Sequence, residues 1–261
     1  MSGLRFKALL LDLDGTLYFK GEMLPRADEA VAGFRRKGLR LRFLTNTDSK
    51  TPATIRSELK RMGLEAAEAE IFTPATAAFE FFRRNPGKRC HCLLSRELAQ
   101  AFAPYISREG KADYVVVGDF RESVTYEALN AAFRHIMAGA EIIALQKGRY
   151  FVRPEGLNLD TGAFVAMFEY ASGKQAQVLG KPSPEFFHLC LSDLGLGPGD
   201  VAVVGDDVTT DVVGARNVGA FSVLVKTGKY SDAARRASAA QPDLVVESAY
   251  HLLDHLGEVG G

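Results

Sequence analysis

An apolar run near the start of the sequence ends in two carboxylates that are one residue apart. The run begins at Phe6, has the composition of a buried parallel strand, and is followed by Asp12, Asp14 and Gly15. Residues i and i+2 of a continuing strand point the same way, so the two carboxylates would crowd one spot. At ~4 Å and an effective dielectric constant of about 20, their repulsion is roughly 4 kcal/mol. This cost is tolerable if a cation binds between them or if the chain turns and separates their tasks; a surface Asp-Gly turn is the simpler alternative.

The segments at both ends of the chain alternate between strand and helix patterns. Residues 25–37 have apolar side chains at helical spacing, residues 39–44 alternate like a strand, and Pro52 and Gly63 bracket a second helix at 53–62. This βαβα order predicts an α/β fold whose core is a doubly wound, Rossmann-like parallel sheet. The later core elements are predicted strands at 177–182, 201–207, 221–225 and 244–246, with helices at 184–194, 208–218 and 249–256.

The middle of the chain, residues 74–174, continues the alternation but brings no convincing cluster of carboxylates to its strand ends. We therefore predict a self-contained α/β insertion between two parts of the core, residues 1–73 and 175–261. Within the insertion, residues 146–162 are predicted to form a loop. Its other elements are predicted helices at 75–84, 97–103, 125–137 and 163–171, with strands at 90–94, 114–118 and 142–145.

The charge balance of the chain is neutral, with 32 basic and 32 acidic residues. Nothing in that balance favours a nucleic acid or an anionic membrane as a partner. No basic leader followed by an apolar segment opens the sequence, and no apolar run approaches the roughly 18 residues of a membrane helix. We therefore expect a cytoplasmic protein that binds neither nucleic acid nor membrane.

The three cysteines, Cys90, Cys92 and Cys190, form no CxxC pair. Cys90 and Cys92 flank His91, which suggests a zinc site, but no second cluster of ligands accompanies them. The alternative that we favour is a buried strand carrying small apolar thiols, which suits a reducing cytosol.

Polar side chains follow four of the predicted strands. Each group on its own has an ordinary explanation as a turn, a helix cap or a solvated side chain. Ligands of open α/β sheets bind at the carboxyl ends of the strands, so we expect these groups to meet there. Carboxylate oxygens suit Mg²⁺, and a lysine with hydroxyl and amide donors suits phosphate oxygens. The combination predicts a phosphoryl-transfer site built from Asp12, Asp14, Thr45, Asn46, Lys181, Asp206, Asp207 and Asp211.

These residues match the four motifs of a known superfamily. The motifs are Asp12-Leu13-Asp14-Gly15-Thr16-Leu17, Thr45-Asn46, Lys181 in Gly-Lys-Pro, and Gly205-Asp206-Asp207 through Asp211. In sequence and order they resemble the haloacid dehalogenase superfamily, and the insertion resembles the C2-type cap of its class IIA. The resemblance implies a catalytic core of residues 1–73 and 175–261 and a cap of residues 74–174. The stretches 225–229 and 180–182 resemble in particular the branch of haloacid dehalogenase-like hydrolase domain-containing protein 2 and phospholysine/inorganic pyrophosphate phosphatase.

The resemblance implies a chemical role for each motif residue. Asp12 would be the nucleophile that forms an aspartyl-phosphate. Asp14 would protonate the leaving oxygen and then deprotonate the attacking water. Thr45 and Lys181 would hold phosphoryl oxygens, and Asn46 would contact the substrate.

The resemblance also implies a Mg²⁺ cofactor. Its ligands would be Asp12, the backbone carbonyl of Asp14, and Asp206, with Asp207 or Asp211 supporting them. The metal would lower the repulsion between Asp12 and the phosphate.

We expect a phosphatase that hydrolyses a small phosphorylated compound, either a phosphomonoester or a pyrophosphate or phosphoramidate. Asp14 argues against dehalogenation, because halide leaves without a proton. A phosphotransferase or mutase on the same intermediate, or a non-catalytic binding protein that keeps the fold, are the alternatives. A homodimer is possible for this class of cap. Candidate specificity contacts, each equally explained as a solvated loop side chain, are Arg149, Arg153, Asn158 and Asp160.

Overall fold

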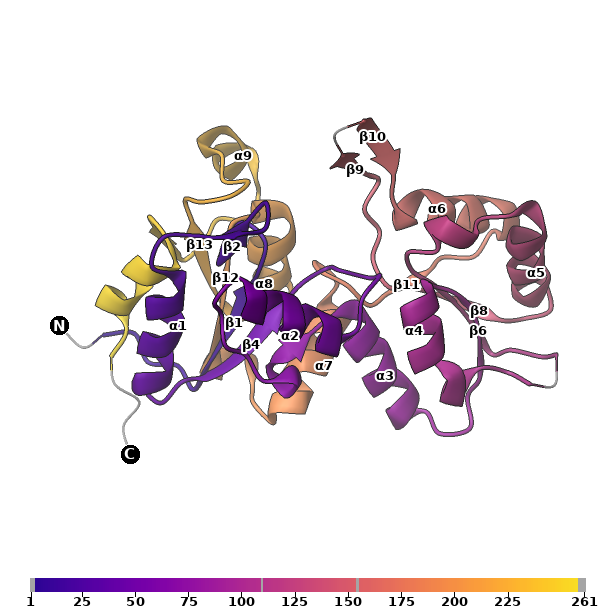
Figure 1. The fold of residues 1–261 in the computed structure, drawn as a ribbon, viewed down its shortest axis with the longest axis horizontal. Coiled ribbons are helices and arrows are strands. Elements are labelled where there is room, and N and C mark those ends of the chain that lie inside the picture. The colour runs from indigo at the N-terminus through magenta and orange to yellow at the C-terminus, as the bar shows by residue number, and fades with distance from the viewer. Residues whose placement is uncertain (1–2, 109, 154, 258–261) are drawn as a thin grey trace. The chain divides into compact units, whose positions relative to one another are not determined.

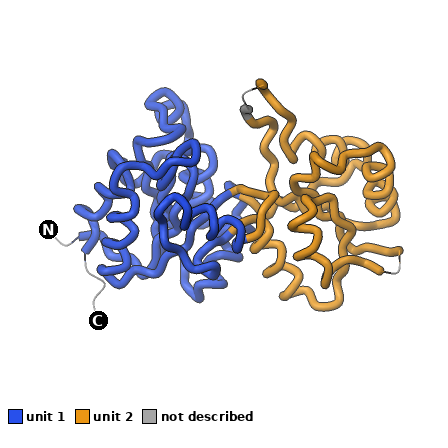
Figure 2. Tube along the Cα trace, in the orientation of Figure 1, with its two compact units in different colours: residues 1–45, 52–72, 181–261 blue, residues 46–51, 73–180 orange. Residues whose placement is uncertain are grey.

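The computed structural model describes residues 3–108, 110–153 and 155–257. The chain divides into two compact units, which Figure 2 distinguishes by colour. Unit 1 comprises residues 1–45, 52–72 and 181–261, and unit 2 comprises residues 46–51 and 73–180. Each unit has its own parallel sheet, so the α/β fold class predicted from the sequence is confirmed.

The sheet of unit 1 has six parallel strands in the order β14-β13-β12-β1-β4-β5. Of these strands, β13, β12, β1 and β4 are labelled in Figure 1. Strand β1, Ala8–Asp12, lies between β12 and β4, and all five of its residues are buried. This central position explains why the strand is apolar without alternation. Its neighbours have the bounds β4 Arg40–Leu44, β5 Ile71–Phe72, β12 Val201–Gly205, β13 Phe221–Val225 and β14 Leu244–Val246.

Helices cover both faces of this sheet. Leu9 and Leu11 of β1 share one apolar cluster with Phe34 of helix α1, while Leu224 on the other face packs against Val208. The doubly wound arrangement follows from the alternation of side chains across each strand. The α-helices are α1 Ala27–Arg36, α2 Pro52–Arg61, α7 Pro184–Leu194, α8 Val213–Val218 and α9 Asp232–Ala237. A π-helical turn spans Val208–Val212, and a 3-10 helix spans Ala249–His255. A small hairpin pairs β2 Tyr18–Phe19 with β3 Glu22–Met23.

Unit 2 contains a four-stranded parallel sheet in the order β11-β8-β7-β6. Its buried strand residues Val115 and Ile142 pack against Ile136 and Phe168 of two covering helices. The hydroxyl of Thr125 accepts a hydrogen bond from the Ala128 amide and so caps one of these helices. The elements are β6 Cys90–Leu93, β7 Tyr114–Val117, β8 Glu141–Ala144, β11 Gln177–Val178, α3 Pro74–Arg84, α4 Arg96–Ala101, α5 Tyr126–Met137 and α6 Thr161–Ser172.

The segment predicted to be a loop at residues 146–162 contains a hairpin instead. Strands β9, Tyr150–Arg153, and β10, Gly156–Leu159, pair antiparallel as a separate two-stranded sheet. The prediction was wrong because Leu157 and Leu159 of β10 are exposed, so this strand lacks the buried apolar face that produces a recognisable period of two.

We predict that Phe34→Ala lowers the free energy of unfolding of unit 1 by about 3–5 kcal/mol, because this ring of helix α1 is fully buried in the apolar cluster that contains Leu9 and Leu11 of β1. Phe19→Ala is the matched control, since its ring is exposed and its loss costs below about 1 kcal/mol. Urea unfolding followed by circular dichroism measures both. Equal losses for the two variants would contradict the packing described.

Candidate active site

The predicted site residues of unit 1 gather at the carboxyl edge of its three central strands. Asp12 is the last residue of β1, and the strand register places it opposite Leu44, the last residue of β4. Thr45 therefore follows at the same edge, and Asp206 follows the last residue of β12. All three side chains are buried. The meeting of groups expected from strand ends is thus found for this part of the motif set.

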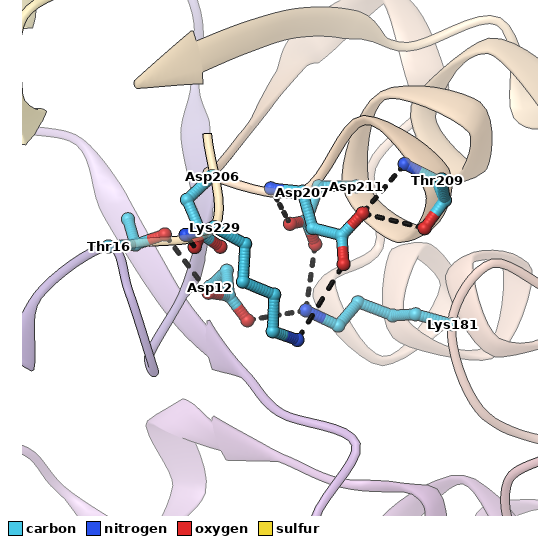
Figure 3. A network of polar contacts seen from close by, with 8 residues as sticks. All are labelled: Asp12, Thr16, Lys181, Asp206, Asp207, Thr209, Asp211 and Lys229. Atoms are coloured by element: carbon cyan, nitrogen blue, oxygen red, sulfur yellow. Dashed lines mark hydrogen bonds and ion pairs between the residues drawn. The ribbon is translucent and has the colours of Figure 1, made fainter. Parts of the chain in front are cut away.

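Lys181 is buried between two carboxylates, as Figure 3 shows. Its Nζ lies 2.5 Å from Asp12 Oδ1 and 2.7 Å from Asp211 Oδ1. Burial by itself would lower the pKa of Lys181, but the charges of Asp12 and Asp211 outweigh it and raise the pKa. The lysine is therefore a fixed positive charge at the end of β1.

The second oxygen of Asp12 also has a donor. The hydroxyl of Thr16 donates to Asp12 Oδ2 at 3.0 Å, within the turn that follows the strand. With Lys181 on Oδ1 and Thr16 on Oδ2, the plane and direction of the Asp12 carboxylate are fixed by hydrogen bonds.

Asp14 lies within the turn that follows β1. The amides of Thr16 and Leu17 donate to the carbonyl of Leu13, and the side chain of Asp14 is exposed. Loss of water around its carboxyl group, and then the charge of Asp12, raise the pKa of Asp14. The two carboxyl groups are therefore near enough for the charge of Asp12 to act on Asp14.

Three buried carboxylates form a potential metal site. Asp12, Asp206 and Asp211 each offer an oxygen, and these oxygens lie within 4.8 Å of one another; among the described residues no other group of acids, histidines and cysteines meets this test. Burial raises the pKa of Asp206 to about 6 and that of Asp211 to about 7. An all-oxygen donor set of three buried acids that share one buried lysine fits Mg²⁺, which would stabilise their charged forms.

The geometry distinguishes the two acids that follow Asp206. Asp207 Oδ1 accepts hydrogen bonds from the amide and the hydroxyl of Thr209, so Asp207 caps the π-helical turn. Asp211 Oδ1 accepts from Lys181 instead, and its Oδ2 accepts from the Asp207 amide at 3.3 Å (Figure 3). The arrangement favours Asp211 as the acid that supports the site.

The loop after β13 contributes contacts that the sequence reasoning did not assign to the site. The amide of Lys229 donates to Asp206 Oδ2 at 2.6 Å, and the hydroxyl of Thr227 donates to the Gly15 carbonyl at 2.5 Å. Gly15 and Gly228 lie so close to Asp206 that a Cβ on either would overlap its carboxylate. The signal was present, because these polar residues also follow a core strand.

Asn46 falls in unit 2, whereas the other predicted motif residues lie in unit 1.

Of the candidate specificity contacts, Asp160 accepts hydrogen bonds from the Thr161 amide and from Gln146 Nε2, so it caps helix α6. Asn158 lines a cavity of 1040 Å³ within unit 2. Arg149 lies just before β9, and the side chain of Arg153 lies outside the described residues.

The cysteines have the form expected for structural thiols. All three are free, and Cys90 and Cys190 are buried. Cys90 Sγ lies 3.4 Å from Cys92 Sγ along strand β6. None of them joins the potential metal group found among the described residues.

Comparison with known proteins places the chain in a family. A model of haloacid dehalogenase-like hydrolases matches residues 9–105, and a second, HAD-hydrolase-like model matches residues 178–252. Haloacid dehalogenase-like hydrolase domain-containing protein 2 of Mus musculus is 38% identical over 96% of this chain and 95% of its own length. The chain belongs to the haloacid dehalogenase-like hydrolase family. The superfamily that the four motifs indicated is therefore confirmed.

Two further relatives extend this finding to the predicted branch and to the fold. Phospholysine phosphohistidine inorganic pyrophosphate phosphatase of Xenopus laevis is 34% identical over 96% of this hydrolase and 94% of its own length. The structure of p-nitrophenyl phosphatase from Archaeoglobus fulgidus matches with a TM-score of 0.89 and 28% identity, covering 97% of this chain and all of that one.

Within the part of the chain that the structure describes, no helix combines the length and apolarity needed to cross a membrane.

We predict that Gly15→Ala destabilises the hydrolase more than Gly21→Ala does. Both glycines have positive φ, at 88° and 82°, so each alanine adds about 1–2 kcal/mol of backbone strain. Only at Gly15 would the new Cβ overlap the Asp206 carboxylate, whereas at Gly21 it meets open space. We expect an additional loss of about 1–3 kcal/mol at Gly15, measured by urea unfolding. Equal effects would argue against the close approach.

Proposed function

We propose that this phosphatase hydrolyses a small phosphorylated compound in a Mg²⁺-dependent reaction that passes through a phosphorylated Asp12. The observation that supports this most is the fixed carboxylate of Asp12. Lys181 and Thr16 hold its two oxygens, and the buried acids Asp206 and Asp211 lie beside it. A carboxylate that is oriented in this way at the end of a central strand is suited to nucleophilic attack.

In the first step, an Asp12 oxygen forms a bond to phosphorus while the bond between phosphorus and the leaving atom breaks. Lys181 lies 2.5 Å from Asp12 and offsets the negative charge that approaches it. The buried Thr45, directly after β4, would hold a phosphoryl oxygen. The product of this step is the aspartyl-phosphate and the departed leaving group.

Asp14 would transfer the protons of both steps. Its raised pKa means that Asp14 holds a proton more readily than an ordinary aspartate, and the protonated carboxyl group would give that proton to the leaving atom. The resulting carboxylate then takes a proton from a water molecule as that water attacks phosphorus. The bond from phosphorus to Asp12 breaks, phosphate leaves, and both carboxyl groups return to their first state.

Asp12, Asp206 and the backbone carbonyl of Asp14 would hold Mg²⁺, supported by Asp211. When bound, the ion offsets the negative charges of the phosphate and the nucleophile. The described geometry agrees with this assignment, because the three buried carboxylates already converge and Lys181 supplies a single positive charge.

The substrate class follows from the relatives rather than from the site. One relative is named for phospholysine, phosphohistidine and inorganic pyrophosphate, and one structural neighbour for p-nitrophenyl phosphate. We therefore propose a phosphomonoester, pyrophosphate or phosphoramidate as substrate, with unit 2 acting as a cap. A phosphotransferase would need an acceptor that outcompetes water for the phosphoryl group. A binding protein would not need an oriented Asp12 carboxylate. The names of the relatives favour hydrolysis over both alternatives.

We predict that Asp12→Asn lowers kcat for p-nitrophenyl phosphate by at least about a thousandfold, because the nucleophile is lost. Chelation of Mg²⁺ should abolish the activity of the wild-type protein, and added Mg²⁺ should restore it. Mass spectrometry of a rapidly quenched reaction should detect a phosphoryl group on the Asp12 peptide of the wild type alone. Full activity of the variant would exclude the aspartyl-phosphate route.

We predict that Asp211→Asn lowers kcat by about a hundredfold, because Lys181 loses one of the carboxylates that hold it. Asp207→Asn is the matched control, since it removes the same charge four residues away but acts on a helix cap. It should cost about 1 kcal/mol of stability and change kcat by less than about threefold. Steady-state kinetics and unfolding curves measure both variants. A reversed order of effects would assign the supporting role to Asp207.

A further inference from the structure

The chain passes between the two units at four junctions, and two of them adjoin site residues. Thr45 is the last residue of unit 1 before the first junction, and Lys181 is the first residue after the last one (Figure 2). Residues 46–51 belong to unit 2 although they connect β4 and α2 of unit 1. Asn46 and Gly180 of unit 2 are therefore the covalent neighbours of Thr45 and Lys181.

Residues 46–51 are anchored to unit 2 by backbone and side-chain hydrogen bonds. The Ser95 hydroxyl donates to the Ser49 carbonyl at 2.7 Å. The amide and hydroxyl of Thr51 both donate to Glu97 Oε1, at 2.6 and 2.5 Å. The Asp119 amide donates to the Asp48 carbonyl at 3.4 Å. The segment is thus hydrogen-bonded to residues that come shortly after strands β6 and β7 of unit 2.

The Asp48 side chain is a further anchor and is buried. Its Oδ2 accepts a hydrogen bond of 2.6 Å from the hydroxyl of Thr161, the first residue of helix α6. The two residues are 113 positions apart in the sequence, so the bond joins the segment to a distant part of unit 2. The mechanism proposed above makes no use of this buried acid.

The charged groups that face Asp48 come from the ends of neighbouring elements. Asp119 follows β7, Asp160 precedes α6, and Arg121 forms an ion pair with Asp119. Burial, together with the charges of Asp160 and Asp119, raises the pKa of Asp48 to about 7, although the Thr161 hydrogen bond opposes this. A neutral Asp48 therefore suits this environment, and an ionised one costs free energy.

The first and last junctions also meet on the side of unit 2. A Cβ built on Gly180 would overlap the Leu145 carbonyl and would lie 3.0 Å from Asn46 Oδ1. The residues that adjoin Thr45 and Lys181 are thus held against each other, and Gly180 has no room for a side chain.

We propose that Asp48 is a positioning residue: through Thr161 it fixes residues 46–51 on unit 2 and so holds Asn46, the predicted substrate contact, in place within that unit. The part of this proposal that concerns catalysis rests on the proposed function. The anchoring itself does not.

The sign of the pH dependence follows from the raised pKa. The folded protein holds the Asp48 proton up to about pH 7, whereas an unfolded or released segment gives it up near the ordinary value of 3.8. The anchoring is therefore strongest at low pH and weakens as the pH rises through 7. Asp48→Asn keeps a neutral group of the same shape and should remove this dependence.

The first test measures amide hydrogen exchange of residues 46–51 by mass spectrometry, corrected for the intrinsic exchange rate. We expect protection in the wild type to fall about tenfold between pH 6 and pH 8.5. Asp48→Asn should show no such fall, and Thr161→Val should be weakly protected at both pH values. The control is Ser172→Ala, which removes a hydroxyl that donates to the Phe168 carbonyl at the other end of α6 and should behave like the wild type. Protection that is independent of pH in the wild type, or unchanged in Thr161→Val, would overturn the proposal.

The second test compares the same variants in the hydrolysis of p-nitrophenyl phosphate between pH 5.5 and 9. We expect Thr161→Val to raise KM and lower kcat/KM about tenfold, and Asp48→Asn to abolish a decline of kcat/KM centred near pH 7. Ser172→Ala should match the wild type. Inactivity of the wild type on every phosphorylated compound would refute the proposed function, while the exchange data would still decide the anchoring. Active variants with unaltered profiles would refute the positioning role of Asp48.

Discussion

The ion pairs of Lys181 with Asp12 and Asp211 are the interaction on which the rest of the site depends. Removing a charged group from water costs several kcal/mol, so each member of this trio is stable only because the others are present. The trio also brings together three distant parts of the sequence at the carboxyl edge of one sheet. Asp206 adds a further buried acid, which leaves the edge with more negative than positive charge and makes it receptive to a cation.

Much of the fold could be predicted because its elements have a clear period or a buried composition. Helix α1 begins and ends within two residues of the prediction, since its apolar residues recur at helical spacing. The same spacing does not distinguish related helices: residues 208–218 were predicted as one helix but begin with a π-helical turn, and residues 249–255 form a 3-10 helix. The three helix types differ in residues per turn, but over the five and seven residues of these segments the apolar pattern is too short to distinguish them.

The strand ends of unit 1 could be found from the sequence because parallel strands place their carboxyl ends along one edge. The hydrogen-bond partners of the individual side chains at that edge could not be predicted from the sequence. Asp207 and Asp211 are both polar residues at the start of a helix, and only the direction of each side chain shows that one caps the helix and the other binds Lys181. The segment 46–51 has no apolar period, so its association with unit 2 depends on hydrogen bonds that have no signature in the sequence.

The strand order of unit 1 has a consequence for synthesis of the chain. Strand β1 is synthesised first, yet its neighbour β12 begins only at Val201. Lys181 is also synthesised late, directly after the last residue of unit 2. Unit 2 is complete once residue 180 has been made, and its strands β6, β7 and β8 are neighbours both in sequence and in the sheet. A chain emerging from the ribosome can therefore form unit 2 while the apolar β1 still lacks one of its two neighbours. During this interval β1 presents an open edge, which can pair with a strand of another chain.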